Sequence, residues 1–583
     1  MRGLPILDWL PGYRRAWLRG DLAAGLTVGV MLIPQGMAYA MIAGLPPVYG
    51  LYAALVPQLA YAVLGTSRQL AVGPVAMDSL LVASGLGAAA AVGEANYVTA
   101  AVFLGLLTGA VQMIFGIFRL GFLVNFLSRP VVSGFTSAAA VVIGVSQFKH
   151  VLGVRIADSS RLQVILARLW GEMGEVSPYA VVIGLSTIAL IALIRRYGRG
   201  IPSALVVVVL GTAVAALTDW YALGLPIVGE VPAGLPGFAV PGVRSGLFVS
   251  LLPIAVTLAL IGYMEAMAIG RAARERVGGG YDIDANQELV ALGAGNVFGS
   301  LWSSYPATAS FSRTAINADA GARTSVAALV SAAVVAGTLL FLTDLFYFLP
   351  NAVLGAIILA AVFKLVDVRY AAGLWRRNRV EALLLTLTFV VTLTVGMVEG
   401  ILAGVFASLA WTVYRDSTPH IAEIARVRGT DYFRNVERFA GDCEVRPDVL
   451  MFRFDAPVFF GNAGYFKDQL LARVAARGGA LQTVVVNAEA ITYVDDTGQH
   501  MLCEVIAALQ ARGLRVVISG AIGPARDSIV RGRVGALIGE ELMFVRSSEV
   551  IDYLDGVGEP GEAQRRIARQ ARAWEYGGVR REG

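Results

Sequence analysis

The segment Ala71-Val-Gly-Pro-Val-Ala-Met-Asp78 decides the fold, because Gly73 and Pro74 interrupt an apolar stretch just before a short apolar helix. The segment Ser303-Ser-Tyr-Pro-Ala-Thr-Ala-Ser-Phe-Ser-Arg313 repeats this pattern about 230 residues later, with Pro306 at the break. Irregular backbone at membrane depth is tolerated only where protein buries it or where it lines a cavity. The two segments therefore predict two structural repeats whose broken helices meet near the middle of a membrane. Two ordinary proline-kinked helices are the alternative.

Composition also indicates a polytopic α-helical membrane protein. Of the 583 residues, 56% are hydrophobic and 15% are charged, whereas soluble domains contain about 25% charged residues. Apolar stretches continue to about residue 415, and charge is dense after that point. The basic, amphipathic start shows no cleavable signal peptide and predicts a short surface helix. We expect about fourteen spans, at residues 20–43, 49–65, 73–89, 97–118, 130–148, 179–196, 201–218, 249–270, 285–300, 307–318, 323–341, 350–366, 380–396 and 398–415.

The charges in the predicted loops indicate the orientation of the chain in a cell (inner) membrane. Cytoplasmic loops carry an excess of Lys and Arg. With a cytoplasmic N-terminus, the outer loops contain mainly acids, and only the long loop 149–178 departs from the rule. An even number of spans also places the C-terminus in the cytoplasm. The basic residues of the inner loops are Arg68, Arg119, Arg129, Arg195, Arg196, Arg199, Arg271, Arg274, Arg276, Arg323, Lys364, Arg369, Arg376, Arg377 and Arg379.

The types of residue present argue against several classes of site. Cys443 and Cys503 lack the spacing of a metal site or of a disulfide framework, and the three histidines are scattered. We expect no metal, no cofactor, no enzymatic activity and no nucleic-acid partner. Two half-helix N-termini that face one another, by contrast, carry unpaired N–H groups and partial positive charge. They predict an anion site that needs little side-chain charge.

The C-terminal part predicts a soluble α/β domain, because strand and helix patterns alternate from residue 417 onward. We expect a cytoplasmic segment at 1–19, a transport domain at 20–416, the α/β domain at 417–556 and a basic tail at 557–583. The tail contains a basic helix that could rest on anionic lipid or remain solvated. The strands are expected at 449–454, 483–487 and 514–519, and the helices at 462–476, 496–511 and near 524–537.

Several ordered motifs resemble the SulP anion transporter family, the sulfate permeases that include mammalian prestin. The match covers nearly the whole chain and ends in a domain that resembles the STAS domain, with the turn Tyr493-Val-Asp495-Asp496-Thr497-Gly498. The position of Thr497 is a phosphorylated Ser or Thr in anti-sigma-antagonist relatives, but a helix cap explains Asp496 or Thr497 equally well. The membrane motifs are Gly20-Asp21-Leu-Ala-Ala-Gly-Leu-Thr-Val, Ile33-Pro34-Gln35-Gly36-Met37-Ala38-Tyr39-Ala40, Gly44-Leu-Pro-Pro-Val-Tyr-Gly-Leu-Tyr52, the Val-Gly-Pro segment and Phe311-Ser312-Arg313.

The resemblance implies a 7+7 inverted repeat with core and gate subdomains, a homodimer, and an anion site between the third and tenth spans. Packing is the alternative role for Tyr39, and a lid-side or cytoplasmic anchor is the alternative for Arg313. The residues that it places at the site are Gln35, Tyr39, Val75, Ala76, Ser310, Ser312 and Arg313.

Two acidic residues interrupt apolar spans. A buried carboxylate in a membrane helix costs roughly 2.5–3.5 kcal/mol and needs a partner, a cavity or a proton. The resemblance links the acid of the span that contains Glu265 to coupling, and we predict that Glu265 takes up a proton. A permanent ion pair with Arg313 or Arg271 is the alternative. Asp78 departs from the apolar residue expected in the family; it is either a dipole-stabilised residue, an anion-repelling group or a second proton site.

The expected function is uptake of a small inorganic oxyanion, sulfate first, by proton-coupled alternating access. A sodium-coupled bicarbonate carrier and a dicarboxylate carrier are the rivals within transport, because the same half-helix site suits all three anions. An anion channel would need a continuous polar path. A membrane sensor would bind the anion without net flux.

Overall fold

The structure of the chain is a computed structural model that describes residues 4–88, 94–122, 128–156, 159, 161–198, 203–242, 245–363, 366–539 and 542–557. The chain divides into two compact units, Met1–Ser408 and Leu409–Gly583. We call them the membrane unit and the soluble unit and describe each by itself. The predicted basic tail helix lies outside the described residues.

Helices build the membrane unit, and each predicted span overlaps a helix of the structure. Among the described residues, five helices are long and apolar enough to cross a membrane, judged by length and composition: α1, most of α5, α6, most of α10, and α17. The helices are α1 (Arg15–Ile42), α2 (Val48–Ala53), α3 (Val56–Leu64), α4 (Ala76–Ala88), α5 (Glu94–Ile117), α6 (Arg129–Leu152), α7 (Leu162–Gly171), α8 (Pro178–Tyr197), α9 (Ser203–Leu217), α10 (Ser245–Arg276), α11 (Ala285–Ser300), α12 (Phe311–Asp319), α13 (Val326–Phe341), α14 (Asn351–Val362), α15 (Val368–Arg377), α16 (Arg379–Thr394) and α17 (Met397–Ser417).

The structure departs from the predicted spans in three ways. The second span is two helices, α2 and α3, and Pro57 lies in the first turn of α3, where its missing N–H costs nothing. The helices of the third and tenth spans begin later than predicted, because each follows a two-residue strand, β1 (Val72–Gly73) or β2 (Thr308–Ala309). The helices α7 and α15 were not expected. A short helix, Pro5–Asp8, precedes α1.

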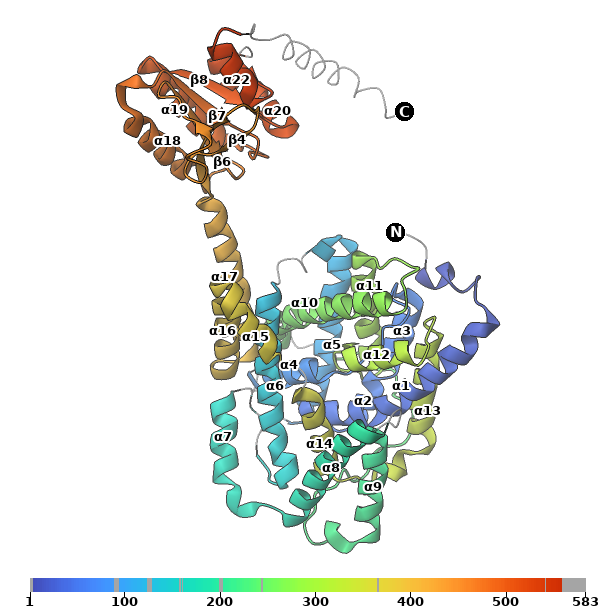
Figure 1. The fold of residues 1–583 in the computed structure, drawn as a ribbon. Helices are drawn as coiled ribbons and strands as arrows, with labels where there is room; N and C mark the ends of the chain where they lie inside the picture. Colours follow the sequence, from blue (N-terminus) through green and yellow to red (C-terminus); the bar gives the residue numbers. More distant parts are fainter. Residues whose placement is uncertain are drawn as a thin grey trace. The chain divides into compact units, whose positions relative to one another are not determined.

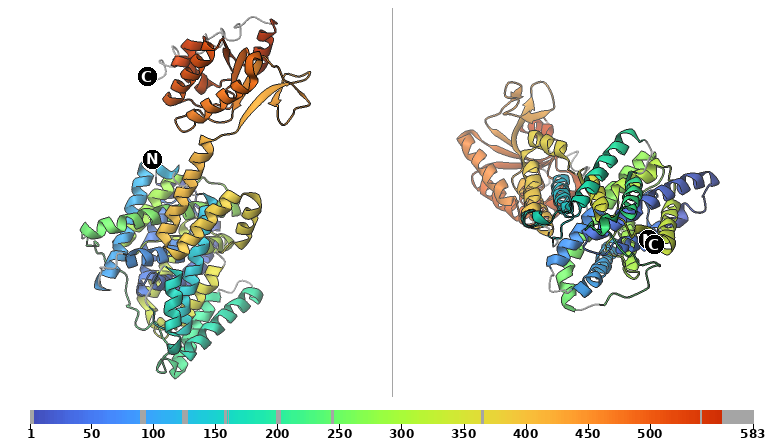
Figure 2. Two further views of the ribbon diagram at one scale, coloured as in Figure 1. Left: turned by 90° about the vertical axis from the view of Figure 1, so that its left-hand side faces the viewer. Right: turned by 90° about the horizontal axis from the view of Figure 1, so that it is seen from below.

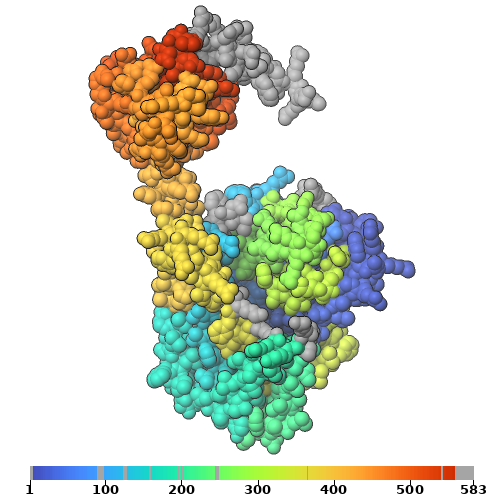
Figure 3. Space-filling model, in the orientation of Figure 1, coloured from blue at the N-terminus to red at the C-terminus, as the bar shows by residue number. Residues whose placement is uncertain are grey.

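Two groups of helices pack among themselves in the membrane unit. One group contains α1–α5 and α10–α13, and the other contains α6–α9 and α14–α16 (Figures 1 and 2). The helix α1 also contacts α9 and α14 of the second group, and α4 contacts α6. In Figure 3, residues of α10–α12 (green) adjoin the N-terminal helices (blue), while α7–α9 (turquoise) gather at one end of the unit.

Close backbone approach holds α1 against α13. A Cβ atom on Gly25 would lie 2.5 Å from the carbonyl oxygen of Ala327, so only glycine fits there without a shift. Membrane helices pack tightly where small residues let their backbones approach, since no hydrophobic effect drives association within lipid. This contact joins the first span of one repeat to a span of the other.

The soluble unit is a seven-stranded mixed sheet with helices on both faces. The strand order is β4-β3-β6-β7-β8-β9, with β5 paired to β3, and β6 to β9 are parallel. Buried side chains from alternate strand positions form one core beneath α18, α19 and α21 and another beneath α22. The elements are β3 (Ile421–Val427), β4 (Phe433–Asn435), β5 (Cys443–Glu444), β6 (Val449–Phe454), α18 (Ala463–Arg477), β7 (Thr483–Asn487), α19 (Asp496–Ala511), β8 (Arg515–Ser519), α20 (Gly523–Arg531), α21 (Arg533–Ile538), β9 (Met543–Phe544) and α22 (Ser547–Leu554).

Two predictions for the soluble unit need correction. The helix expected near 524–537 is divided between α20 and α21, with Gly532 in extended backbone between them. Any Cβ at this position would lie 2.5 Å from the Gln499 side chain. The N-cap of α19 is Asp495, whose carboxylate accepts a 2.7 Å hydrogen bond from the N–H of Gly498. The cap is therefore neither Asp496 nor Thr497, and Thr497 is exposed in the first turn.

Candidate functional site

Two broken helices meet at a small sheet inside the membrane unit. The strands β1 and β2 are antiparallel, with Val72 opposite Ala309 and Gly73 opposite Thr308. The N–H of Ser310 extends this pairing by donating to the carbonyl of Ala71 at 3.0 Å. Because the strands lead directly into α4 and α12, the pairing brings two helix N-termini to one place from opposite directions. Such an arrangement is that of an inverted repeat, as the sequence predicts.

The two half-helices present different side chains at this place. At the start of α12, the Ser310 hydroxyl lies 3.5 Å from the N–H of Arg313, which it caps, and 3.4 Å from the Ser312 hydroxyl. Ser312 is exposed, whereas Val75 and Ala76 at the start of α4 are buried and apolar. Helix N-termini attract anions through their free N–H groups and their dipole. Both helices therefore contribute positive electrostatic potential from their N-termini, and the segment at the start of α12 also supplies hydroxyl groups.

Arg313 lies at the crossing and not at a lid or a cytoplasmic anchor. Its side chain is fully buried, and Nη2 donates to the carbonyl of Pro74 at 2.9 Å. The guanidinium of α12 is therefore hydrogen-bonded to the backbone between β1 and α4. In the described part of the chain, Nε and Nη1 have no hydrogen-bond partner. An unpaired buried donor is costly. Nε and Nη1 are therefore two unsatisfied donors at the crossing.

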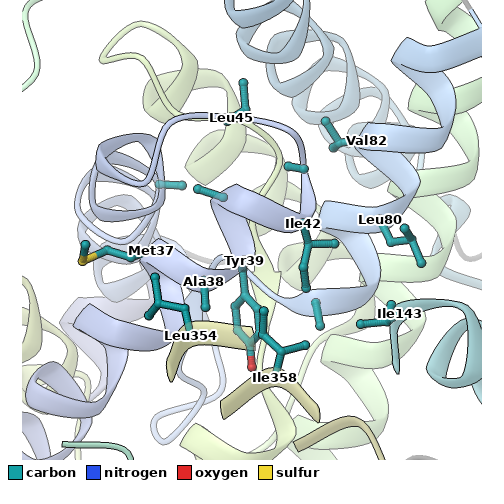
Figure 4. Packing of buried hydrophobic residues seen from close by; sticks show 14 of the residues in the cluster. Met37, Ala38, Tyr39, Ile42, Leu45, Leu80, Val82, Ile143, Leu354 and Ile358 are labelled. Carbon is teal, nitrogen blue, oxygen red and sulfur yellow. The ribbon is translucent and has the colours of Figure 1, made fainter. Parts of the chain in front are cut away.

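The predicted α1 residues are both buried. Gln35 is buried, and its Oε1 has no hydrogen-bond partner among the described residues. Tyr39 is also buried and experiences the charge of Arg313. Its ring lies beside Ile358 and Leu354 of α14 (Figure 4). Packing and proximity to the site therefore coexist at Tyr39.

The two intramembrane acids are neighbours. Asp78, in the first turn of α4, is 2% exposed, and its Oδ1 has no hydrogen-bond partner in the described residues. The helix α10 passes close by: a Cβ on Gly262 would lie 3.7 Å from Oδ2 of Asp78, and the Gly262 carbonyl accepts a 3.0 Å hydrogen bond from Thr308. Glu265 follows one turn later and is partly exposed, with Asp78 as its charged neighbour.

The structure removes one alternative for Glu265. Among the described residues, Glu265 makes no ion pair with Arg313 or Arg271: Arg313 bonds Pro74, and Arg271 is exposed on α10. A carboxyl group at membrane depth without an ion-pair partner needs a cavity or a proton.

Sequence reasoning missed several residues that position the crossing. The Tyr305 hydroxyl is 3.1 Å from that of Ser79, which links the segment before β2 to α4. The Oδ1 of Asn296 accepts from the N–H of Ala307 at 2.8 Å, and its Nδ2 donates to Gln112 at 3.0 Å. These residues could have been found from the sequence, because each is a polar residue in or beside an apolar span.

Two further buried carboxylates are fully hydrogen-bonded. Glu288 of α11 accepts from Tyr61, from the hydroxyl and N–H of Thr66 and from the N–H of Ser67, at 2.6 to 3.1 Å. Asp21 of α1 makes the equivalent set with Tyr13, Arg323 and Thr324, at 2.7 to 3.1 Å. Each carboxylate therefore holds a loop that adjoins a half-helix segment: one precedes β1, and the other follows α12.

Comparison with known proteins agrees with this geometry. Residues 18–388 match the Sulfate permease family, and residues 442–548 match the STAS domain. The chain belongs to the sulfate permease family. It is 36% identical over 568 residues to Sulfate transporter 4.1, chloroplastic, of Arabidopsis thaliana. This alignment covers 94% of this chain and 82% of the relative. The sulfate permease assignment confirms the fold class that the motifs predicted, a multi-pass membrane transporter with a C-terminal STAS domain.

Solved structures support the same architecture. Murine Solute Carrier 26 family member A9, an anion transporter in the inward-facing state, matches with a TM-score of 0.89 at 25% identity, over 95% of this chain and 94% of that chain. The transmembrane domain of the cyanobacterial bicarbonate transporter BicA matches with a TM-score of 0.59 at 24% identity, over 68% of this chain and 98% of that one. The second likeness concerns the fold alone.

Proposed function

We propose that this sulfate permease family member is a secondary active transporter that takes up sulfate together with protons by alternating access. The observation that carries the proposal is the pair of half-helix N-termini at the β1–β2 crossing, with two unpaired donors of Arg313 beside them. A curated relative, 36% identical, is named as a sulfate transporter. Transport leaves the covalent bonds of the anion intact, so the site needs no catalytic group.

The anion would bind at the crossing through donors of several kinds. The backbone N–H groups near Val75 and Ala76 would face it from α4, and the hydroxyls of Ser310 and Ser312 from α12. Gln35 and Tyr39 would contribute from α1, and Arg313 would supply positive charge. Together these groups replace the hydration shell of an oxyanion, since charged hydrogen bonds are stronger than neutral ones.

Glu265 would couple the anion to a proton, because it is the partly exposed acid next to the crossing. In this proposal, the group formed by α1–α5 and α10–α13 carries the site past the other helices, with both termini in the cytoplasm and two chains in a dimer. Alternating access in transporters with inverted repeats is largely rigid-body movement of one bundle against another. The STAS domain, with Thr497 exposed, would be accessory or regulatory.

The test is uptake of radiolabelled sulfate into proteoliposomes with an inward proton gradient and no sodium. We expect accumulation above the external concentration that collapses when a protonophore dissipates the gradient. Protein-free liposomes are the control for leak. Flux without accumulation would indicate a channel, and binding without flux would indicate a sensor.

A second set of conditions separates the rival substrates and coupling ions. If folded protein accumulates no sulfate, the same vesicles are tested with bicarbonate and a dicarboxylate, each with and without sodium. Sodium-dependent bicarbonate uptake would replace the proposal with that of a sodium-coupled bicarbonate carrier.

A further inference from the structure

We infer that Asp78 and Glu265 each carry one proton with each sulfate, so that this transporter moves two protons per divalent anion without net charge. The inference rests on the proposed function and adds the stoichiometry and the second proton site. It assigns to Asp78 a role that the anion site itself does not need.

The geometry brings the two carboxyl groups together from different repeats. Asp78 lies in the first turn of α4, and Gly262 of α10 is so close that a Cβ there would sit 3.7 Å from Oδ2 of Asp78. Glu265 is three residues further along α10 and therefore on the same face. Glu265 is partly exposed while Asp78 is buried with an unpaired Oδ1. A proton can therefore enter through Glu265 and reach Asp78 behind it.

The surrounding helices contain few charged groups that could neutralise Asp78 and Glu265. Residues 98–117 of α5 and 130–148 of α6 contain no ionisable side chain. Tyr39 and Tyr305 face the region from α1 and from the segment before β2, and Arg313 from α12 is bonded to Pro74. The remaining acids nearby are satisfied elsewhere: Glu288 accepts hydrogen bonds from Tyr61, Thr66 and Ser67, and Asp319 pairs with Arg276 at 2.8 Å.

Two protons on Asp78 and Glu265 would balance the two negative charges of sulfate. The empty site, with two carboxylates and the Arg313 guanidinium, carries a net charge of about −1 in this account. The loaded site holds two protonated carboxyl groups, the guanidinium and sulfate at −2, which is again about −1. Both protons bind carboxylate oxygens outside and leave them inside, together with sulfate. The protein then crosses between states with the same charge in both directions, so the membrane potential does not oppose uptake.

The test measures the sulfate accumulation ratio in proteoliposomes as the pH gradient and the membrane potential are varied separately, with valinomycin and potassium setting the potential. For the wild-type protein we expect accumulation to rise about 100-fold for each unit of pH difference, and not to change with potential. For Asp78→Asn we expect the sulfate accumulation ratio to rise only about 10-fold for each unit of pH difference. An interior potential of −100 mV should then lower accumulation by Asp78→Asn about 50-fold, because one uncompensated negative charge moves inward.

The control variant is Asp282→Asn, which changes an exposed acid paired with Arg274 and should keep the wild-type slope. A wild-type slope of 10-fold per pH unit, or an unchanged slope in folded Asp78→Asn, would overturn the inference while the proposed function stands. Complete absence of sulfate accumulation by the wild-type protein would instead contradict the proposed function. The wild-type slope decides the stoichiometry even if Asp78→Asn does not fold.

Discussion

Buried carboxylates of the membrane unit fall into two kinds. Glu288 and Asp21 each accept four hydrogen bonds from a tyrosine, a threonine hydroxyl and two consecutive backbone N–H groups. Asp78 is equally buried, yet its Oδ1 has no partner among the described residues. A buried polar group is normally satisfied, and each exception needs an explanation. The satisfied acids hold loops of the fold, and the proton-carrying role that we propose for Asp78 would explain the exception.

The comparison predicts the largest loss of stability when a satisfied acid is removed. Glu288→Ala leaves the Tyr61 hydroxyl and the N–H groups of Thr66 and Ser67 buried without an acceptor. Each buried donor left without an acceptor costs about 1–3 kcal/mol. Thermal unfolding in detergent should show a large fall in Tm for Glu288→Ala and a small one for Asp78→Asn. Equal losses in the two variants would abolish the distinction.

The second prediction concerns coupling. In Glu265→Gln the side chain keeps its shape but cannot carry a proton. At a pH difference of two units, accumulation of sulfate should fall by at least about 100-fold, because the proton of Glu265 no longer moves with the anion. Exchange of internal for external sulfate, which needs no net proton movement, should continue. If Glu265→Gln keeps the full wild-type accumulation at this pH difference, the proton role of Glu265 is wrong.

The third prediction concerns the anion itself. Arg313→Ala removes the two free donors at the crossing and also the bond to the Pro74 carbonyl. Hydrogen bonds to charged groups contribute about 1.5–3 kcal/mol, so the initial rate of uptake at low sulfate should fall roughly 10–100-fold. Arg313→Lys is the matched control, because it keeps the charge and loses the planar geometry. Its initial rate of uptake should fall less than that of Arg313→Ala. Equal rates for wild type and Arg313→Ala would remove Arg313 from the site.

The smallest expected effect concerns a paired acid of the soluble unit. Burial raises the pKa of Asp455, but hydrogen bonds from Arg453 and His420 lower it, and the net pKa lies below the usual value. Such an acid stabilises the fold above its unfolded pKa of about 3.9, and that stability is lost as pH falls through the folded pKa.

Proteolysis of the soluble unit in the full-length protein should therefore accelerate below about pH 4 in the wild type. Asp455→Asn should be cleaved faster at neutral pH and should show a flatter dependence on pH. Parallel pH profiles for the two proteins would show that the pairing of Asp455 contributes nothing to stability.

Local signals in the sequence determined much of this architecture. The length of each apolar run, the missing N–H of proline and the alternation of strand and helix patterns act over a few residues. They located the helix breaks before α4 and α12, the helices that overlap the predicted spans, and the strands β6, β7 and β8 of the soluble unit with the helices that follow them. The strands β3, β4, β5 and β9 and the helix α22 were not predicted. The family motifs then pointed to the crossing, to Arg313 and to Glu265.

Only the tertiary structure decided how the polar groups are satisfied. The bond from Arg313 to Pro74 joins residues far apart in the chain, as do the contacts of Glu288 with Thr66 and of Asp21 with Thr324. The same holds for the close approach of α10 to Asp78. The sequence around Asp21 and Asp78 does not show which carboxyl group is satisfied by hydrogen bonds. The donors that separate them come from distant segments and exist only after the chain has folded.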